Sequence, residues 1–346
     1  MVYLVFTFFV ILFIIARSKY WKISSYLIAV YAFSVFFSIF LYNSSDPYYR
    51  HTSFIASIVF CVSLFLYFSP YFRKELFIES NNNSRFIRRF SIVGYIISIT
   101  LLIGCILLFS KIMEVASFGL VEARHLAYTE DETLTSFTTL QHIGHSDLRW
   151  LSGLSYTMLI MFFYAMSFIK GKVFLKVLLF LSSLSATYLG ITNGGRTRLI
   201  YWILFFIFTL ILFRPYLSKR TKKIIFSVSV LFFSLIGLYF AYITFGRADV
   251  LGRTTGNFLI EYVGQPYLNF CNFYENFHYK HFTLYRIFPL TSYFISGLFD
   301  LTEYRDKVYA HSHMEINGFN TFIGDFYIDV GLLGIIVYSI VYFLIS

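Results

Sequence analysis

The chain has 346 residues, of which 58% are hydrophobic and only 13% are charged, and its mean hydropathy is +0.69. Soluble domains carry roughly 25% charged residues, so this composition excludes an ordinary soluble globular protein. A net charge of +10 would suggest nucleic-acid binding in a soluble protein. Here the charges fall in short clusters between apolar runs, so we expect no nucleic-acid partner.

Nine apolar runs are candidates for transmembrane helices, because a helix needs about 20 apolar residues to cross roughly 30 Å of hydrocarbon. The first run lacks the cationic start and the small-residue cleavage site of a secretory signal, so we keep it as a span. We therefore predict an all-α, polytopic helical membrane protein with about nine spans. The runs are residues 2–16, 24–42, 53–72, 90–110, 150–169, 173–191, 199–213, 224–244 and 330–346.

The distribution of lysine and arginine predicts the orientation of these spans, because both are enriched in cytoplasmic connections. If alternate connections are inside, the inner side carries 16 basic and two acidic residues, and the outer side carries 12 basic and 16 acidic residues. All four inner connections are rich in basic residues. The N-terminus is therefore predicted to lie outside.

Two connections on the predicted outer side are too long to be turns, namely residues 111–149 and 245–329. Connections of this length are uncommon in compact proteins and tend to be functional. Within the second loop, Thr254–Phe277 and Thr283–Phe299 are predicted to form interfacial or re-entrant helices. If 283–299 crossed the membrane instead, the carboxyl end would change sides. We expect a single integral membrane domain over residues 1–346.

Two arginines stand against the charge rule in the connection between the sixth and seventh spans, Thr192-Asn193-Gly194-Gly195-Arg196-Thr197-Arg198. Asn-Gly favours a tight turn. The N–H groups of this turn and the start of the seventh helix would face the same space as both guanidinium groups, which predicts an anion site. The alternative is that Arg196 and Arg198 extend to lipid phosphates, as interfacial cations often do.

A second pair of arginines opens the large outer loop, at Arg247 and Arg253. Arg247 could simply pair with Asp249, because exposed ion pairs are frequent and weak. Arg253 has no neighbouring carboxylate in the sequence, so it is the better candidate for binding an external anion. Its planar guanidinium group can bind two phosphate oxygens at once.

The segment before the last span combines imidazoles with carboxylates. His311, His313 and Glu315 follow one another closely, and Asp325 comes shortly before the span. His-x-His with a following Glu could ligate a metal, but it would need a strand and a correctly placed third ligand. A general base near the membrane surface is the second alternative, and an ordinary solvated loop is the third. We predict neither a metal nor a cofactor.

The sequence has no Walker loop and no dinucleotide-binding glycine motif after a strand. The outer face offers no cytosolic nucleotide pool, so chemistry there needs a substrate that is already activated. A sugar linked through diphosphate to a membrane lipid meets this requirement. Its leaving group departs readily when fixed cations stabilise the charge that develops on it.

These features resemble the O-antigen polymerase (Wzy-type) family, within the wider group that includes the O-antigen ligases. The similarity rests on the Gly194–Arg198 turn, on Phe245–Arg253, and on Asn320–Gly334 with its Asn-Thr start and its Gly-Leu-Leu-Gly end. It covers the whole chain by topology but only these three short motifs by residue. In the related ligases a His precedes the Asn of the last motif, whereas Phe319 precedes it here, and relatives usually continue for one or more further spans.

The resemblance implies a glycosyltransferase of the bacterial inner (plasma) membrane with its active site facing the exterior. Such an enzyme moves a growing glycan from undecaprenyl diphosphate onto the next lipid-linked repeat unit, with inversion, and builds O-antigen or capsular polysaccharide. Its partners would be the lipid-linked donor and acceptor, membrane lipids, a chain-length regulator and a flippase. The resemblance implies diphosphate binding by Arg196, Arg198, Arg247 and Arg253, and places the candidates for the general base at His313, His311, Glu315 and Asp325.

Two other functions remain open. An O-antigen ligase would share the donor but would use lipid A core as the acceptor. A transporter or flippase of lipid-linked sugars would place ionisable residues inside its spans and would often show repeated halves. The spans predicted here are almost free of charge, apart from Lys176 near an inner edge.

Overall fold

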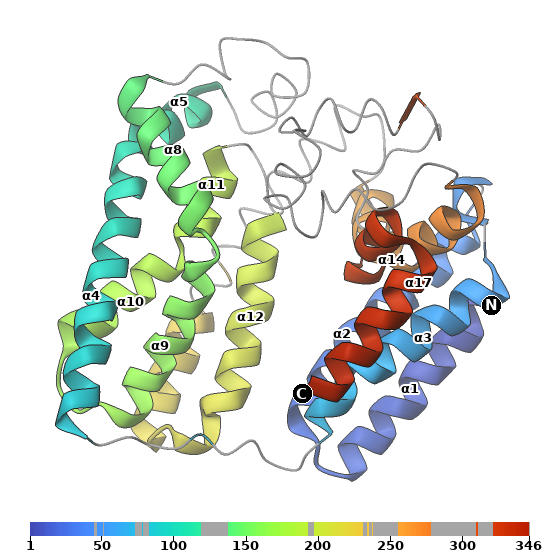
Figure 1. Cartoon of the computed structure of the whole chain (residues 1–346), viewed down its shortest axis with the longest axis horizontal. Helices are drawn as coiled ribbons and strands as arrows, with labels where there is room; N and C mark the ends of the chain where they lie inside the picture. The colour runs from blue at the N-terminus through green and yellow to red at the C-terminus, as the bar shows by residue number, and fades with distance from the viewer. Residues whose placement is uncertain are drawn as a thin grey trace. The chain divides into compact units, whose positions relative to one another are not determined.

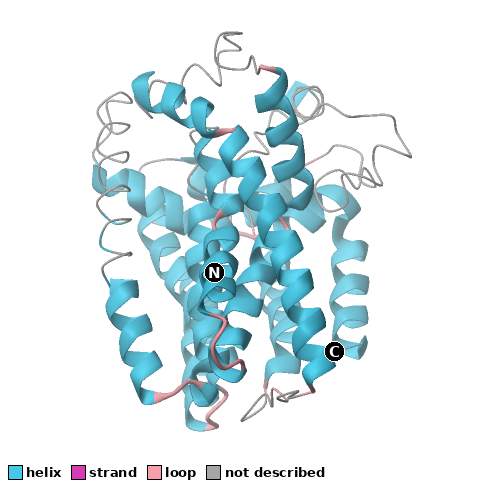
Figure 2. Cartoon of the chain, turned by 90° about the vertical axis from the view of Figure 1, so that its left-hand side faces the viewer, coloured by secondary structure: helices cyan, strands magenta, loops and turns pink. Residues whose placement is uncertain are grey.

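The computed structural model of the chain describes twelve segments, which are mostly helical and contain no strand (Figures 1 and 2). The described residues are 1–44, 47–50, 52–72, 78, 83–118, 138–192, 197–230, 234, 237, 255–277, 309–310 and 321–345. The helices are α1 (Val2–Ser18), α2 (Lys22–Tyr42), α3 (Phe54–Phe68), α4 (Ser84–Leu107), α5 (Phe109–Phe118), α8 (Thr139–Leu151), α9 (Leu154–Phe168), α10 (Val173–Ser183), α11 (Ser185–Thr192), α12 (Thr197–Phe213), α14 (Thr255–Asn276) and α17 (Phe322–Ile345). Residues 219–230 are also helical.

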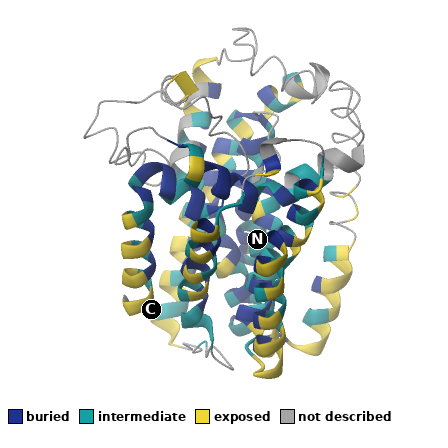
Figure 3. Ribbon diagram, turned by 90° about the vertical axis from the view of Figure 1, so that its right-hand side faces the viewer, coloured by how far each residue is buried: buried dark blue, intermediate teal, exposed yellow. Residues whose placement is uncertain are grey.

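Six helices of the described part are long and apolar enough to cross a membrane: α2, α4, α12 and α17, α3 with the short turn that follows it, and α10 with α11. The shorter apolar helices α1 and α9 coincide with the predicted first and fifth spans. Exposed Ile92, Val93, Ile96, Ile99, Ile103 and Ile106 follow one another along α4, as expected of a face that contacts lipid, and Figure 3 shows such exposed residues on several helices. The prediction of an all-α membrane protein is confirmed. The total number of spans stays a prediction, because residues 224–244 are described only in part.

The helices pack into two compact units. Unit 1 comprises Met1–Glu75 and Arg253–Ser346, and thus contains α1, α2, α3, α14 and α17. Unit 2 comprises Leu76–Gly252 and contains α4 to α12. The expected single membrane domain is therefore built from two units, one of which joins both ends of the chain.

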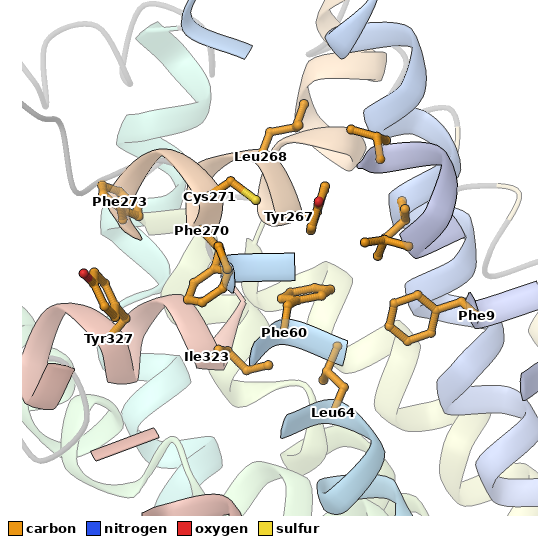
Figure 4. Packing of buried hydrophobic residues seen from close by; sticks show 14 of the residues in the cluster. Phe9, Phe60, Leu64, Tyr267, Leu268, Phe270, Cys271, Phe273, Ile323 and Tyr327 are labelled. Atoms are coloured by element: carbon orange, nitrogen blue, oxygen red, sulfur yellow. The ribbon is translucent and has the colours of Figure 1, made fainter. Parts of the chain in front are cut away.

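Unit 1 is organised around an aromatic core at Phe60 of α3 (Figure 4). The ring centroid of Phe60 lies 6.2 Å from that of Phe9, 5.3 Å from that of Tyr267 and 5.8 Å from that of Phe270. Centroid separations of 4.5–7 Å are those at which aromatic rings attract one another by their edges and faces. These rings hold α14 against α1 and α3.

Helix α14 lies in the predicted large outer loop and coincides with the helix expected over Thr254–Phe277. All seven residues from Tyr267 to Phe273 are buried, so protein covers this part of the helix on every side. Pro266 lies within it and has no N–H for the carbonyl one turn before it. Two hydroxyls of α2 donate hydrogen bonds to carbonyls at this place, Ser34 Oγ to Val263 O at 2.8 Å and Ser38 Oγ to Gly264 O at 2.6 Å. These two hydrogen bonds join α2 to α14 in the turn that precedes the proline.

Helix α17 begins at Phe322, eight residues before the predicted start of the last span. Thr321 precedes it, and its Oγ1 accepts a hydrogen bond from Gly324 N at 3.2 Å, which satisfies one N–H of the first turn. Gly331 interrupts the helix with φ 69° and ψ −171°, a conformation that is essentially restricted to glycine. The hydropathy of the sequence predicted the segment after this break, and the polar Asp325 and Asp329 concealed the turns before it.

In unit 2, both ends of the predicted first outer loop are helical, as α5 and α8. Helix α8 starts with a capping box, in which Thr138 Oγ1 accepts from Gln141 N and Gln141 Oε1 accepts from Thr138 N. Helix α8 packs closely on α4, because a Cβ at Gly144 would lie 2.8 Å from Leu107 Cβ and a Cβ at Gly104 would lie 2.9 Å from Leu148 Cγ. The long connection is thus not simply a loop, and its capping box was readable in the sequence.

Candidate functional site

The eight predicted site residues divide between the two units. Among them, the described part of the chain includes Arg198, which belongs to unit 2, and Asp325, which belongs to unit 1. The other six lie outside the described residues: Arg196, Arg247, Arg253, His311, His313 and Glu315. Their roles stay predictions.

Arg198 is the second residue of α12, next to the end of α11. Its stem lies over Gly190 of α11, since a Cβ added at Gly190 would be 3.2 Å from Arg198 Cβ and 3.4 Å from Arg198 Cδ. The side chain is half-buried, and its Nη1 atom is shielded from solvent. Packing of the aliphatic stem is expected of an arginine at an anion site and also of one that extends to lipid phosphates. The anion site at Arg198 therefore stays a prediction.

The guanidinium group of Arg198 has a phenol among its neighbours. Its positive charge acts electrostatically on Tyr156, which is near the start of α9 and whose ring lies 5.3 Å from Phe205 of α12, edge to face. A guanidinium group and a phenol can both donate hydrogen bonds to an anion. The start of α12 adds the positive end of a helix dipole. Residues of three helices, α9, α11 and α12, thus lie near the guanidinium group of Arg198 and form the candidate cationic site.

Asp147 of α8 is a half-buried carboxylate that the sequence did not single out. Its Oδ2 would lie 3.1 Å from a Cβ at Gly104, and its charge acts on Cys105 of α4. Desolvation by the close packing of α8 on α4 raises the pKa of Asp147. The amphipathic pattern of α8 was the available signal, because it places Asp147 one turn after the tightly packed Gly144.

The raised pKa of Asp147 predicts a dependence of stability on pH. The folded protein binds this proton more tightly than the unfolded chain does, so the stabilisation is complete below the usual pKa of about 4 and is lost as pH rises through the higher folded value. We expect the difference in melting temperature between Asp147→Asn and the wild type, measured in detergent, to change across this window in favour of the Asn variant. A difference that is the same from about pH 3.5 to about pH 7 would contradict the prediction.

Asp325 lies in the first turn of α17, where its backbone N donates to Thr321 O at 3.1 Å. A negative charge there is stabilised by the positive end of the helix dipole. Asp325 is half-buried, whereas Asp329, one turn further along, is fully buried. The structure thus gives Asp325 a structural role in starting the helix, and its role as a general base stays a prediction.

The arrangement in unit 2 that the described residues support is a cationic site at the start of α12, formed by Arg198, Tyr156 and Gly190. The described part of the chain contains no group of three His, Cys, Asp or Glu side chains that could hold a metal ion, and its cysteines are free thiols. The segment His311–Glu315, to which the metal alternative applied, lies outside it. No family model matches the chain, and no curated protein and no solved structure is significantly similar to it.

Proposed function

We propose that the protein is a membrane glycosyltransferase that polymerises oligosaccharide repeat units carried on undecaprenyl diphosphate, on the outer face of a bacterial inner membrane. The observation that carries the proposal is the half-buried Arg198 at the start of α12, packed on Gly190 and next to Tyr156. It is supported by the long polar segments between the apolar helices and by the resemblance of the three motifs to O-antigen polymerases.

The proposed reaction needs cations more than it needs a proton donor. A hydroxyl of the acceptor sugar attacks the anomeric carbon of the donor glycan, the bond from that carbon to the diphosphate oxygen breaks, and the lipid diphosphate leaves as an anion. Arg198 and the arginines expected beside it stabilise the charge that develops on the diphosphate. A carboxylate or imidazole among His311, His313, Glu315 and Asp325 accepts the proton of the attacking hydroxyl.

Substitution of Arg196 and Arg253 in cells tests this function. Arg196→Ala and Arg253→Ala, each shown to be inserted at wild-type levels, should leave single repeat units and abolish the ladder of longer glycans on a gel. Each variant loses a planar guanidinium group, which can bind two phosphate oxygens at once. Lysine at either position should restore the function only in part, because its ammonium group is a point charge. Arg214→Ala is the matched control, because Arg214 belongs to a basic connection predicted to lie on the other face. An unchanged ladder in both test variants would refute the assignment.

The same gels distinguish a polymerase from an O-antigen ligase, which is the alternative of the same enzyme class. Loss of an O-antigen ligase leaves long polymer on the carrier lipid, whereas loss of a polymerase leaves glycans of one unit. Loss of a transporter of lipid-linked sugars would leave the repeat units on the inner face of the membrane, where an external glycosidase cannot reach them.

A further inference from the structure

Unit 2 contains an apolar groove of about 430 Å³ between α9, α10, α12 and the helix of residues 219–230. Its floor consists of the buried side chains of Trp202, Phe206 and Ile225. Its rim includes Val177 and Val228, which are 48% and 54% exposed. The groove is therefore accessible from the surface of the helix bundle and is large enough for a small ligand.

The groove runs along α10 from Val173 to Leu181. Leu181 lies eight residues after Val173, which corresponds to about 12 Å at a rise of 1.5 Å per residue. The hydrocarbon layer is roughly 30 Å thick, so one leaflet contributes about half of that thickness. The groove is somewhat shorter than the hydrocarbon depth of one leaflet. An occupant that enters from one end would thus reach about to the middle of the membrane.

Basic residues gather in the connections near the start of α10. Lys176 is among the residues that line the groove, and helical side chains lean toward the N-terminal end of their helix. Lys170 and Lys172 lie immediately before α10, and both are exposed. Residues 170–176 and 214–223 contain no acidic residue and have eight basic ones, Lys170, Lys172, Lys176, Arg214, Lys219, Arg220, Lys222 and Lys223.

We propose that this groove holds one acyl chain of an anionic phospholipid from the leaflet at the basic end, with its phosphate bound at Lys176. The surface of the groove is almost entirely apolar, which matches a hydrocarbon chain. The basic connections match the negative charge of the headgroup, because lysines and arginines near a membrane surface attract anionic lipids. The second acyl chain stays in the surrounding lipid. This site is separate from the cationic site at Arg198 and does not depend on the proposed transferase activity.

Two features of the groove can be tested independently, its volume and its charge. The full-length protein is delipidated in detergent, and binding of phosphatidylglycerol and phosphatidylethanolamine is measured by native mass spectrometry. We expect the wild type to bind phosphatidylglycerol at least fivefold more tightly, since one lysine near the surface contributes about that factor. Lys176→Gln should remove most of this preference, whereas Lys19→Gln, at an exposed residue of unit 1 that does not line the groove, should change it little.

Val177→Trp should fill the groove and reduce the binding of both lipids. Val93→Trp on α4 is its matched control, because Val93 is 47% exposed and does not line the groove. Melting temperatures of all variants show whether each is folded. The proposal is overturned if the two tryptophan variants bind lipid equally, or if the wild type does not prefer phosphatidylglycerol. Tighter binding of a polyprenyl phosphate than of phosphatidylglycerol would also overturn it and would assign the groove to a carrier lipid.

Discussion

Arg198→Ala is expected to lower the rate of glycan transfer by a hundredfold or more. Loss of one preorganised donor that stabilises charge in a transition state typically costs a factor of 10² to 10³ in kcat. Arg198 is half-buried on Gly190, so it is held in place before substrate arrives. The measurement is polymer formation from a synthetic undecaprenyl-diphosphate-linked repeat unit by the purified protein in liposomes.

The matched variants separate the charge of Arg198 from its position. Arg198→Lys keeps the charge but loses the planar group, so it should recover only part of the rate. In Gly190→Ala the new methyl would lie 3.2 Å from Arg198 Cβ, which should displace the stem and lower the rate by a smaller factor. Gly153→Ala is the control, because nothing lies within 4 Å of a Cβ there. A wild-type rate for Arg198→Ala would exclude this residue from the reaction.

Gly264→Ala is expected to destabilise unit 1 by about 3 kcal/mol, at the upper end of the usual cost of overpacking. A Cβ at Gly264 would lie 2.7 Å from Phe37 C and 2.8 Å from Phe37 O of α2. These are backbone atoms, so no rotation of a side chain can relieve the contact, and α14 must move away from α2. We expect a fall in Tm of roughly 5 °C or more in detergent.

Two further variants identify the cause of that loss. Ser38→Ala removes the 2.6 Å hydrogen bond to Gly264 O without adding an atom between the helices, and should cost about 1 kcal/mol. Gly153→Ala, where the added methyl meets open space, should leave Tm unchanged. If Gly264→Ala were as stable as the wild type, the close approach of α2 and α14 would be refuted.

The sequence predicted the apolar helices well, because the hydropathy of some 20 consecutive residues is a local property. It decides whether that segment can cross the hydrocarbon core as a helix. Helix α2 and the span formed by α10 and α11 lie within a few residues of their predicted bounds. Polar helices were harder to predict. Helix α8 carries His145, Asp147 and Arg149, so its composition is that of a loop, and only its cap and the spacing of its packed residues indicate a helix.

The sequence predicted only part of the candidate site, because only part of it lies in one short segment. The Gly-Gly-Arg-Thr-Arg turn indicated an anion site from the types of its residues, and this is information that a short segment contains. Its neighbours Tyr156 and Gly190 come from α9 and α11, and no local pattern connects them with Arg198. The same holds for Asp147, whose pKa depends on how closely α8 packs on α4.

The sequence by itself determined that this is a helical membrane protein, where most of its apolar helices lie, and which arginines depart from the charge rule. The tertiary structure alone decided that residues 1–75 and 253–346 form one unit, that α14 is buried on all sides over Tyr267–Phe273, and that Arg198 packs on Gly190. The physical reason is that helix formation depends on nearby residues, whereas contacts such as Ser38 to Gly264 join residues 226 positions apart. Only the packed chain brings such residues together.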